Sequence, residues 1–124
     1  MKLWIDDIRP APEGYIWVKS VNEAKDVIGQ YADFINSIDV TNVRNFDLRK
    51  QLLRDLRPFF AEDDLIDIDH DAGEYVEDGG DYIKLLDWFE EQGYDFLIHI
   101  HSQNPVGVEN MRRIIRRNGW KEIL

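Results

Sequence analysis

Three short apolar runs in this chain each end in a cluster of acidic, histidine or serine side chains. The runs cover residues 3–5, 65–68 and 96–98, and their length and branched or aromatic residues are typical of buried β-strands. In an open α/β sheet, ligands bind at the carboxyl ends of the strands. Three strands that end in this way predict a single site at one edge of a parallel sheet.

The clusters contain most of the candidate site residues. The chain has only three histidines, and all of them lie in two of these clusters. Carboxylates suit hard divalent ions, whereas imidazoles serve as metal ligands or as acids and bases. Together with a hydroxyl they predict a site for a metal and a phosphate. The members are Asp6 and Asp7, then Asp69, His70 and Asp71, and finally His99, His101 and Ser102.

The length and composition predict one soluble globular domain over residues 1–124. A content of 44% hydrophobic and 32% charged residues is that of a folded chain rather than a disordered one. The absence of cysteine excludes disulfides, zinc–thiolate sites and cysteine catalysis. No apolar run approaches the ~20 residues of a membrane span and no signal peptide precedes the first strand, so we expect a cytoplasmic protein without a membrane partner.

The charge balance limits the partners of this protein. A formal net charge of −10 argues against binding of long duplex nucleic acid, which needs many cationic contacts to phosphates. A small phosphorylated ligand or an RNA terminus is still compatible with this charge, because a bound cation would reverse the local field around the carboxylates.

Strand and helix patterns alternate along the chain, which predicts an α/β fold with a mainly parallel sheet. The stretch 8–14 contains two prolines and reads as an extended crossover to a parallel second strand. Residues 20–23 form a capping box, which predicts a helix start. We expect strands at about 2–6, 15–19, 65–69, 95–101 and 120–124, and helices at about 20–38, 45–60, 82–92 and 107–118.

Each acidic cluster has an ordinary interpretation beside the functional one. Asp6 and Asp7 repel each other unless a cation or a donor intervenes, yet an Asp pair is more often a solvated turn. Asp69 and Asp71 share one side of the strand, and we rank Asp67 below them because it lies deeper. The alternative for this second cluster is a loop of solvated acids.

The pair His99 and His101 is the most specific signal. Both side chains point to one side of the strand, where burial without partners would be costly. They could ligate a metal or exchange protons in phosphoester cleavage, and Ser102 could bond a phosphoryl oxygen. The alternative is a pair of structural histidines with satisfied hydrogen bonds.

Three further residues are candidate phosphate ligands. Asn104 and Gly107 lie where the last helix begins, and the free N–H groups of a helix N-terminus bind anions. Arg9 follows the acidic pair and could hold a phosphate with two hydrogen bonds, or could equally form a loop salt bridge.

The segments 3–14, 68–71 and 98–107, followed by Glu109, Asn110 and Met111, resemble the receiver-like family proposed to process cyclic phosphates. The resemblance covers about 2–28 and 64–117. It implies a receiver-like (flavodoxin-like) three-layer sandwich in which residues 29–62 form an extra helical insertion. That insertion could serve as a lid, as a homodimer surface or as an elaboration.

The resemblance also implies roles for individual residues. Asp6 and Asp7 correspond to the acidic metal-binding pair of receivers, and Asp69 resembles the aspartate that receivers phosphorylate. Ser102 matches the receiver hydroxyl position. A Lys-Pro motif at a late strand end is absent, which departs from receivers, and the added histidines suggest catalysis instead of signalling.

Three functions follow as alternatives. The first is a metal-dependent phosphoesterase for nucleotide or RNA 2′,3′-cyclic phosphates, with Mg²⁺ or Mn²⁺ held by Asp6, Asp7, Asp69 and Asp71. In that interpretation His99, His101, His70 and Ser102 are catalytic. The second is a non-catalytic phospho-receiver or phosphate-binding module, and the third is a structural partner protein.

Overall fold

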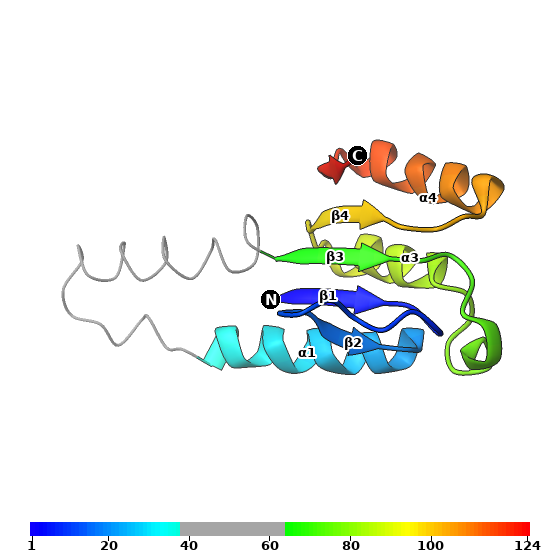
Figure 1. Ribbon diagram of the computed structural model, residues 1–124. Coiled ribbons are helices and arrows are strands. Elements are labelled where there is room, and N and C mark those ends of the chain that lie inside the picture. Colours follow the sequence, from blue (N-terminus) through cyan, green and yellow to red (C-terminus); the bar gives the residue numbers. More distant parts are fainter. Residues whose placement is uncertain (38–63) are drawn as a thin grey trace.

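The computed structural model describes residues 1–37 and 64–124, which fold around one parallel sheet (Figure 1). The expected helix at 45–60 and most of the expected insertion at 29–62 lie outside the described residues. The strands are β1 (Lys2–Ile5), β2 (Ile16–Val18), β3 (Leu65–Ile68), β4 (Leu97–Ile100) and β5 (Glu122–Ile123). The helices are α1 (Val21–Ser37), a 3₁₀ turn η2 (Gly73–Tyr75), α3 (Ile83–Gln92) and α4 (Pro105–Asn118).

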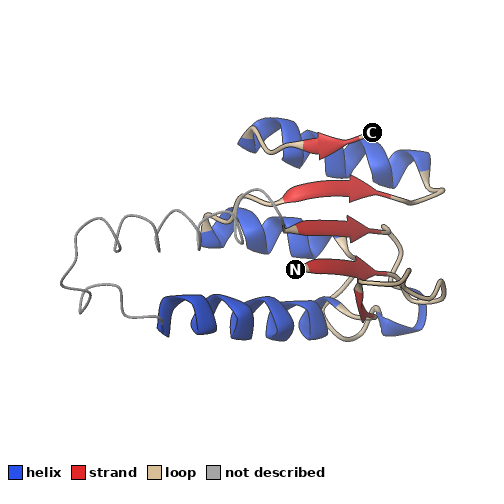
Figure 2. Ribbon diagram, turned by 60° about the vertical axis from the view of Figure 1, so that its left-hand side comes forward, coloured by secondary structure: helices blue, strands red, loops and turns tan. Residues whose placement is uncertain are grey.

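The five strands lie in the order β2-β1-β3-β4-β5, and every neighbouring pair is parallel. Their carboxyl ends therefore point to the same edge of the sheet, as the arrows in Figures 1 and 2 show. This confirms the parallel second strand, which an extended connection of ten residues reaches without a helix. The polar clusters that follow β1, β3 and β4 thus end neighbouring strands.

Capping residues set the ends of the helices that flank the site. The Ser20 hydroxyl accepts a hydrogen bond from the Glu23 amide at 3.0 Å and so begins α1. Asn104 Oδ1 accepts from the Gly107 amide at 3.0 Å and begins α4 two residues earlier than expected. Gly119 ends that helix with a positive φ of 68°, which a side chain would disfavour.

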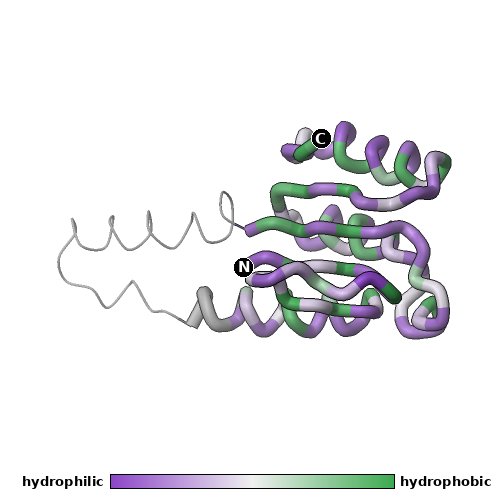
Figure 3. Tube along the Cα trace, viewed as in Figure 1, coloured by the Kyte–Doolittle hydropathy of each residue, from purple (hydrophilic) through white to green (hydrophobic). Residues whose placement is uncertain are grey.

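The hydrophobic core lies between one face of the sheet and the helices. Apolar and polar residues alternate along the chain trace, as Figure 3 shows, so that each strand gives one side to the core. The strand residues that are buried in this core share one parity: Leu3, Ile5, Val18, Ile66, Ile68 and Ile98. They pack with buried residues of α1, α3 and α4, such as Ile28, Phe89 and Met111.

The opposite face of the sheet has no helix on it among the described residues. Trp4, Asp67 and His99 lie side by side on this face, because they are directly paired in the strand register. The extended β1–β2 connection crosses it, and Trp4 Nε1 donates to the Arg9 carbonyl there at 2.8 Å. The parallel five-stranded sheet and its helices confirm the expected receiver-like (flavodoxin-like) α/β fold.

Candidate metal and phosphate site

Asp6 directly follows β1 and is almost fully buried, with 1% of its surface exposed. Its Oδ1 accepts hydrogen bonds from the amides of Ile8 at 2.9 Å and Arg9 at 2.8 Å. Burial raises the pKa of Asp6. The hydrogen bonds from these amides and from the positively charged His101 have the larger effect, so the pKa is lowered overall. Asp6 is therefore held as a buried carboxylate rather than a solvated turn residue.

His101 lies between two carboxylates. Its Nε2 is 2.9 Å from Asp6 Oδ2, and its Nδ1 is 2.6 Å from Asp67 Oδ1. The Trp4 ring stacks on the imidazole at 3.9 Å with an interplanar angle of 4°. Burial lowers the pKa of His101, but the hydrogen bonds and charges of Asp67 and Asp6 more than offset this and raise the pKa overall.

Asp67 joins the two histidines that the sequence singled out. The same oxygen that contacts His101 lies 2.9 Å from His99 Nδ1. The Asp67 side chain is 8% exposed, whereas the His99 side chain is 35% exposed. A row of hydrogen bonds therefore runs across the helix-free face from Asp6 through His101 and Asp67 to His99.

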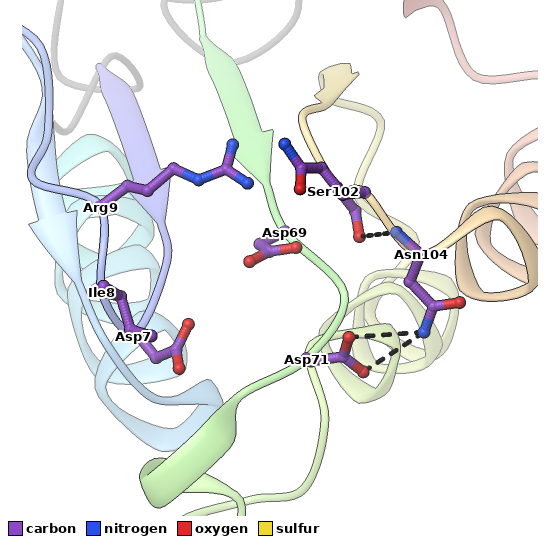
Figure 4. A pocket seen from close by; sticks show the side chains of 8 residues that line it. Asp7, Ile8, Arg9, Asp69, Asp71, Ser102 and Asn104 are labelled. Carbon is purple, nitrogen blue, oxygen red and sulfur yellow. Dashed lines mark hydrogen bonds between the residues drawn. The ribbon is translucent and has the colours of Figure 1, made fainter.

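An open cavity of about 320 Å³ lies at the same edge, beside this row (Figure 4). This volume is at the lower end of the range for small-molecule sites. Most of its lining is polar and comes from the ends of β1, β3 and β4: Asp7, Ile8, Arg9, Asp69, Asp71, Ser102, Gln103 and Asn104. Six of the predicted site residues therefore line one cavity.

The Arg9 side chain extends over the cavity toward Asp69 (Figure 4). Among the described residues, its guanidinium makes one hydrogen bond, a donation from Nη1 to the His101 carbonyl at 3.3 Å. No carboxylate of the described residues lies within 4.0 Å of the guanidinium, so the expected loop salt bridge is not formed there. The guanidinium keeps donors that could bind a phosphate.

Negative charge accumulates where β1 and β3 end. Burial raises the pKa of Asp7, and the nearby charges of Asp6 and Asp69 raise it further. A cation at this point would relieve the repulsion. Ligand atoms of Asp6, Asp69 and His101 all lie within 4.8 Å of one another, so these residues fit a divalent metal ion. Asp7 lies beside this group and Asp71 does not belong to it.

His70 and Asp71 form hydrogen bonds with each other and with Asn104 rather than joining the metal group. His70 Nδ1 is 2.8 Å from Asp71 Oδ1, and Asn104 Nδ2 donates to Asp71 at 3.4 Å (Figure 4). The Gly107 amide donates to Asn104, so a phosphate would have to displace this cap to reach it. A Cβ on Gly107 would lie 2.4 Å from the His70 ring, which shows how closely the ring packs on α4.

Ser102 lines the cavity at the end of β4. Its hydroxyl oxygen accepts a hydrogen bond from the Asn104 amide at 3.1 Å (Figure 4). The hydroxyl proton keeps its freedom to donate to a bound anion.

The sequence pattern ranks Asp67 below Asp69, because Asp67 lies deeper in the strand, but Asp67 has the larger role in the structure. The structure places it directly opposite His99 and in contact with both His99 and His101. The one sign of this role in the sequence is that Asp67 and Asp69 are two residues apart and so point to the same side of the strand. The sequence gives no sign that Trp4 stacks on His101, because that contact depends on which strands are neighbours.

The fold and the cluster of acids at the strand ends define a receiver-like domain. The family model for the cyclic-phosphate processing receiver domain matches residues 1–117, and the chain belongs to this family. Neither a search of curated proteins nor a search of solved structures found a match. In the described parts of the chain, no helix is both long and apolar enough to cross a membrane.

Proposed function

We propose that this protein is a metal-dependent phosphoesterase that opens cyclic phosphates, such as the 2′,3′-cyclic end of a nucleotide or an RNA. The observation that carries the proposal is the convergence of Asp6, Asp69 and His101 beside a polar cavity over which an arginine extends. Metal ligands, a phosphate ligand and histidines for proton transfer are what phosphoester hydrolysis requires. The family's description supports the substrate class.

Each group has a role in this proposal. Asp6, Asp69 and His101 would hold Mg²⁺ or Mn²⁺ and Asp7 would add charge beside them; the bound ion would polarise the phosphoryl group. Arg9 donates to the phosphoryl oxygens from across the cavity, where it has no carboxylate partner among the described residues.

Hydrolysis of an oligonucleotide that ends in a 2′,3′-cyclic phosphate tests this function. We expect opening in Mg²⁺ or Mn²⁺ and none in EDTA. The double variant His99→Ala/His101→Ala should lose the activity while its circular dichroism spectrum stays that of the wild type. Asp95→Asn is the matched control, because this exposed residue lies at the amino end of β4. Wild-type rates in the histidine variant would refute the assigned roles.

A phosphate-binding receiver without turnover is the second candidate. The placement of Asp69 at the end of β3, in the cavity with Asp7, favours it. Incubation with acetyl phosphate followed by intact-mass measurement separates the two functions. A stable phosphoryl adduct that Asp69→Asn abolishes, together with no hydrolysis of cyclic phosphates, would support the receiver and contradict the esterase.

A further inference from the structure

Among the described residues, Asp67 is the one carboxylate that contacts both His99 in β4 and His101, which directly follows β4. A single oxygen, Oδ1, lies 2.9 Å from His99 Nδ1 and 2.6 Å from His101 Nδ1. A carboxylate accepts hydrogen bonds and does not donate them, so each imidazole has to present a protonated Nδ1 to it. The nitrogen that remains for other chemistry is Nε2 in both residues.

The two Nε2 atoms face different surroundings. His101 Nε2 is 2.9 Å from Asp6 Oδ2, and the His101 side chain is 8% exposed beneath the Trp4 ring. His101 Nε2 therefore faces the group of Asp6 and Asp69 that would hold the metal, and it is not open to the substrate. His99 Nε2 makes no hydrogen bond to any described residue, and the His99 side chain is 35% exposed on the helix-free face.

The strand geometry relates His99 to the cavity. Two residues of a strand span about 7 Å, so His99 lies that far from His101 along β4, on the same face. His101 in turn is bonded to Asp6 at the edge of the sheet. Among the described residues no helix separates His99 from this edge, and a substrate bound in the cavity could extend over the face to reach it.

We propose that Asp67 is a positioning residue that holds His99 and His101 by Nδ1, so that His99 exchanges protons with the substrate and His101 does not. The proposal rests on the proposed phosphoesterase function and assigns different roles to His99 and His101. His101 belongs to the group that would hold the metal, whereas His99 carries the free nitrogen.

The chemical step balances with water as the only co-reactant. A water oxygen bonds to phosphorus, and one ring P–O bond of the cyclic phosphate breaks. His99 Nε2 takes a proton from the water and gives it to the ribose oxygen that is released. The product is a phosphomonoester with one free hydroxyl, and His99 ends in its starting state. Asp67 keeps Nδ1 protonated throughout.

Nuclear magnetic resonance of the protein labelled with ¹⁵N in its histidine rings tests the positioning without any substrate. The spectrum of the metal-free protein in EDTA should show the neutral His99 ring with its proton on Nδ1. In Asp67→Asn a population with the proton on Nε2 should appear, whereas Asp95→Asn should leave the ring signals unchanged. Single His→Gln variants assign the signals. A wild-type ring protonated on Nε2 overturns the proposal even if Asp67→Asn does not fold.

Steady-state kinetics on the cyclic-phosphate oligonucleotide tests the roles assigned to His99 and Asp67. His99→Gln should lower kcat by about 10²- to 10⁴-fold, the range for loss of a general acid or base. Asp67→Asn should lower kcat by about 10- to 100-fold with little change in KM, as removal of a supporting carboxylate does. Wild-type kcat in His99→Gln would overturn the proposal. A wild type that hydrolyses no cyclic phosphate would refute the phosphoesterase function, and the ring spectrum would still decide whether Asp67 positions the histidines.

Discussion

The His101 imidazole lies between the buried carboxylates of Asp6 and Asp67, with the Trp4 ring on one of its faces. Desolvation opposes its charge, and the two carboxylates favour it more strongly, so its pKa is raised. A raised pKa of a histidine means that the folded state binds a proton more tightly than the unfolded chain. In the absence of metal, the protonated His101 therefore stabilises the fold.

The pH dependence of stability tests this residue. The stabilisation is complete below the unfolded pKa of about 6.5 and is lost as the pH rises through the higher folded pKa. In EDTA, the free energy of unfolding from urea titrations should therefore fall above about pH 6.5. His101→Gln should flatten this fall. Parallel curves for the variant and the wild type would contradict the charge assigned to His101.

At the scale of elements, the first turn of α4 and the β3–α3 connection pack closely beside the site. The connection is tied to α1, where the Ser20 hydroxyl donates to Asp78 Oδ2 at 2.5 Å. The His70 ring rests on the backbone of Gly107 in α4. These contacts give α4 a fixed position relative to the cavity, with no room for a side chain at Gly107.

Replacement of Gly107 by alanine tests this packing. The new Cβ would lie 2.4 Å from the His70 ring, and overpacking of this kind costs about 1–3 kcal/mol. Gly29→Ala in α1 is the matched control, because its Cβ would meet nothing within 4 Å and should stabilise the helix by about 0.5–1 kcal/mol. Urea denaturation measures both. A Gly107→Ala variant as stable as Gly29→Ala would show that His70 does not pack there.

Several elements could be predicted from the sequence because their signals are local. Hydrophobic runs located β1, β3 and β4, Ser20 marked the start of α1, and the clusters at the strand ends are brought to one edge by the parallel order. The contact of Asp67 with His99 and His101 could not be predicted from local sequence signals. It depends on strand register, which pairs Asp67 with His99 across 32 residues.

At the scale of the whole molecule, a chain with a net charge of −10 places several carboxylates at one sheet edge. The carboxylates repel one another there: burial and the charges of Asp6 and Asp69 raise the pKa of Asp7. A divalent cation would bind the folded state and not the unfolded chain, and would stabilise the fold by mass action. On the helix-free face beside this edge, the His99 side chain is 35% exposed, whereas the His101 side chain is only 8% exposed.

Thermal unfolding with and without metal tests the cation site. Addition of Mg²⁺ or Mn²⁺ at about 100 times its Kd should stabilise the protein by about 2.7 kcal/mol and raise the Tm. Asp69→Asn should lose most of this rise, whereas Asp95→Asn should keep it. An equal rise in both variants would assign the effect to general screening of the negative charge rather than to a site.

Hydrolysis of a cyclic phosphate at this edge of the sheet can be observed directly by ³¹P nuclear magnetic resonance. A 2′,3′-cyclic nucleotide incubated with the wild-type protein and Mg²⁺ should lose its cyclic phosphate signal and gain a phosphomonoester signal at the same rate. The sample in EDTA should keep the cyclic signal. A cyclic signal that persists with the metal-loaded protein, at every metal tested, would contradict the phosphoesterase function.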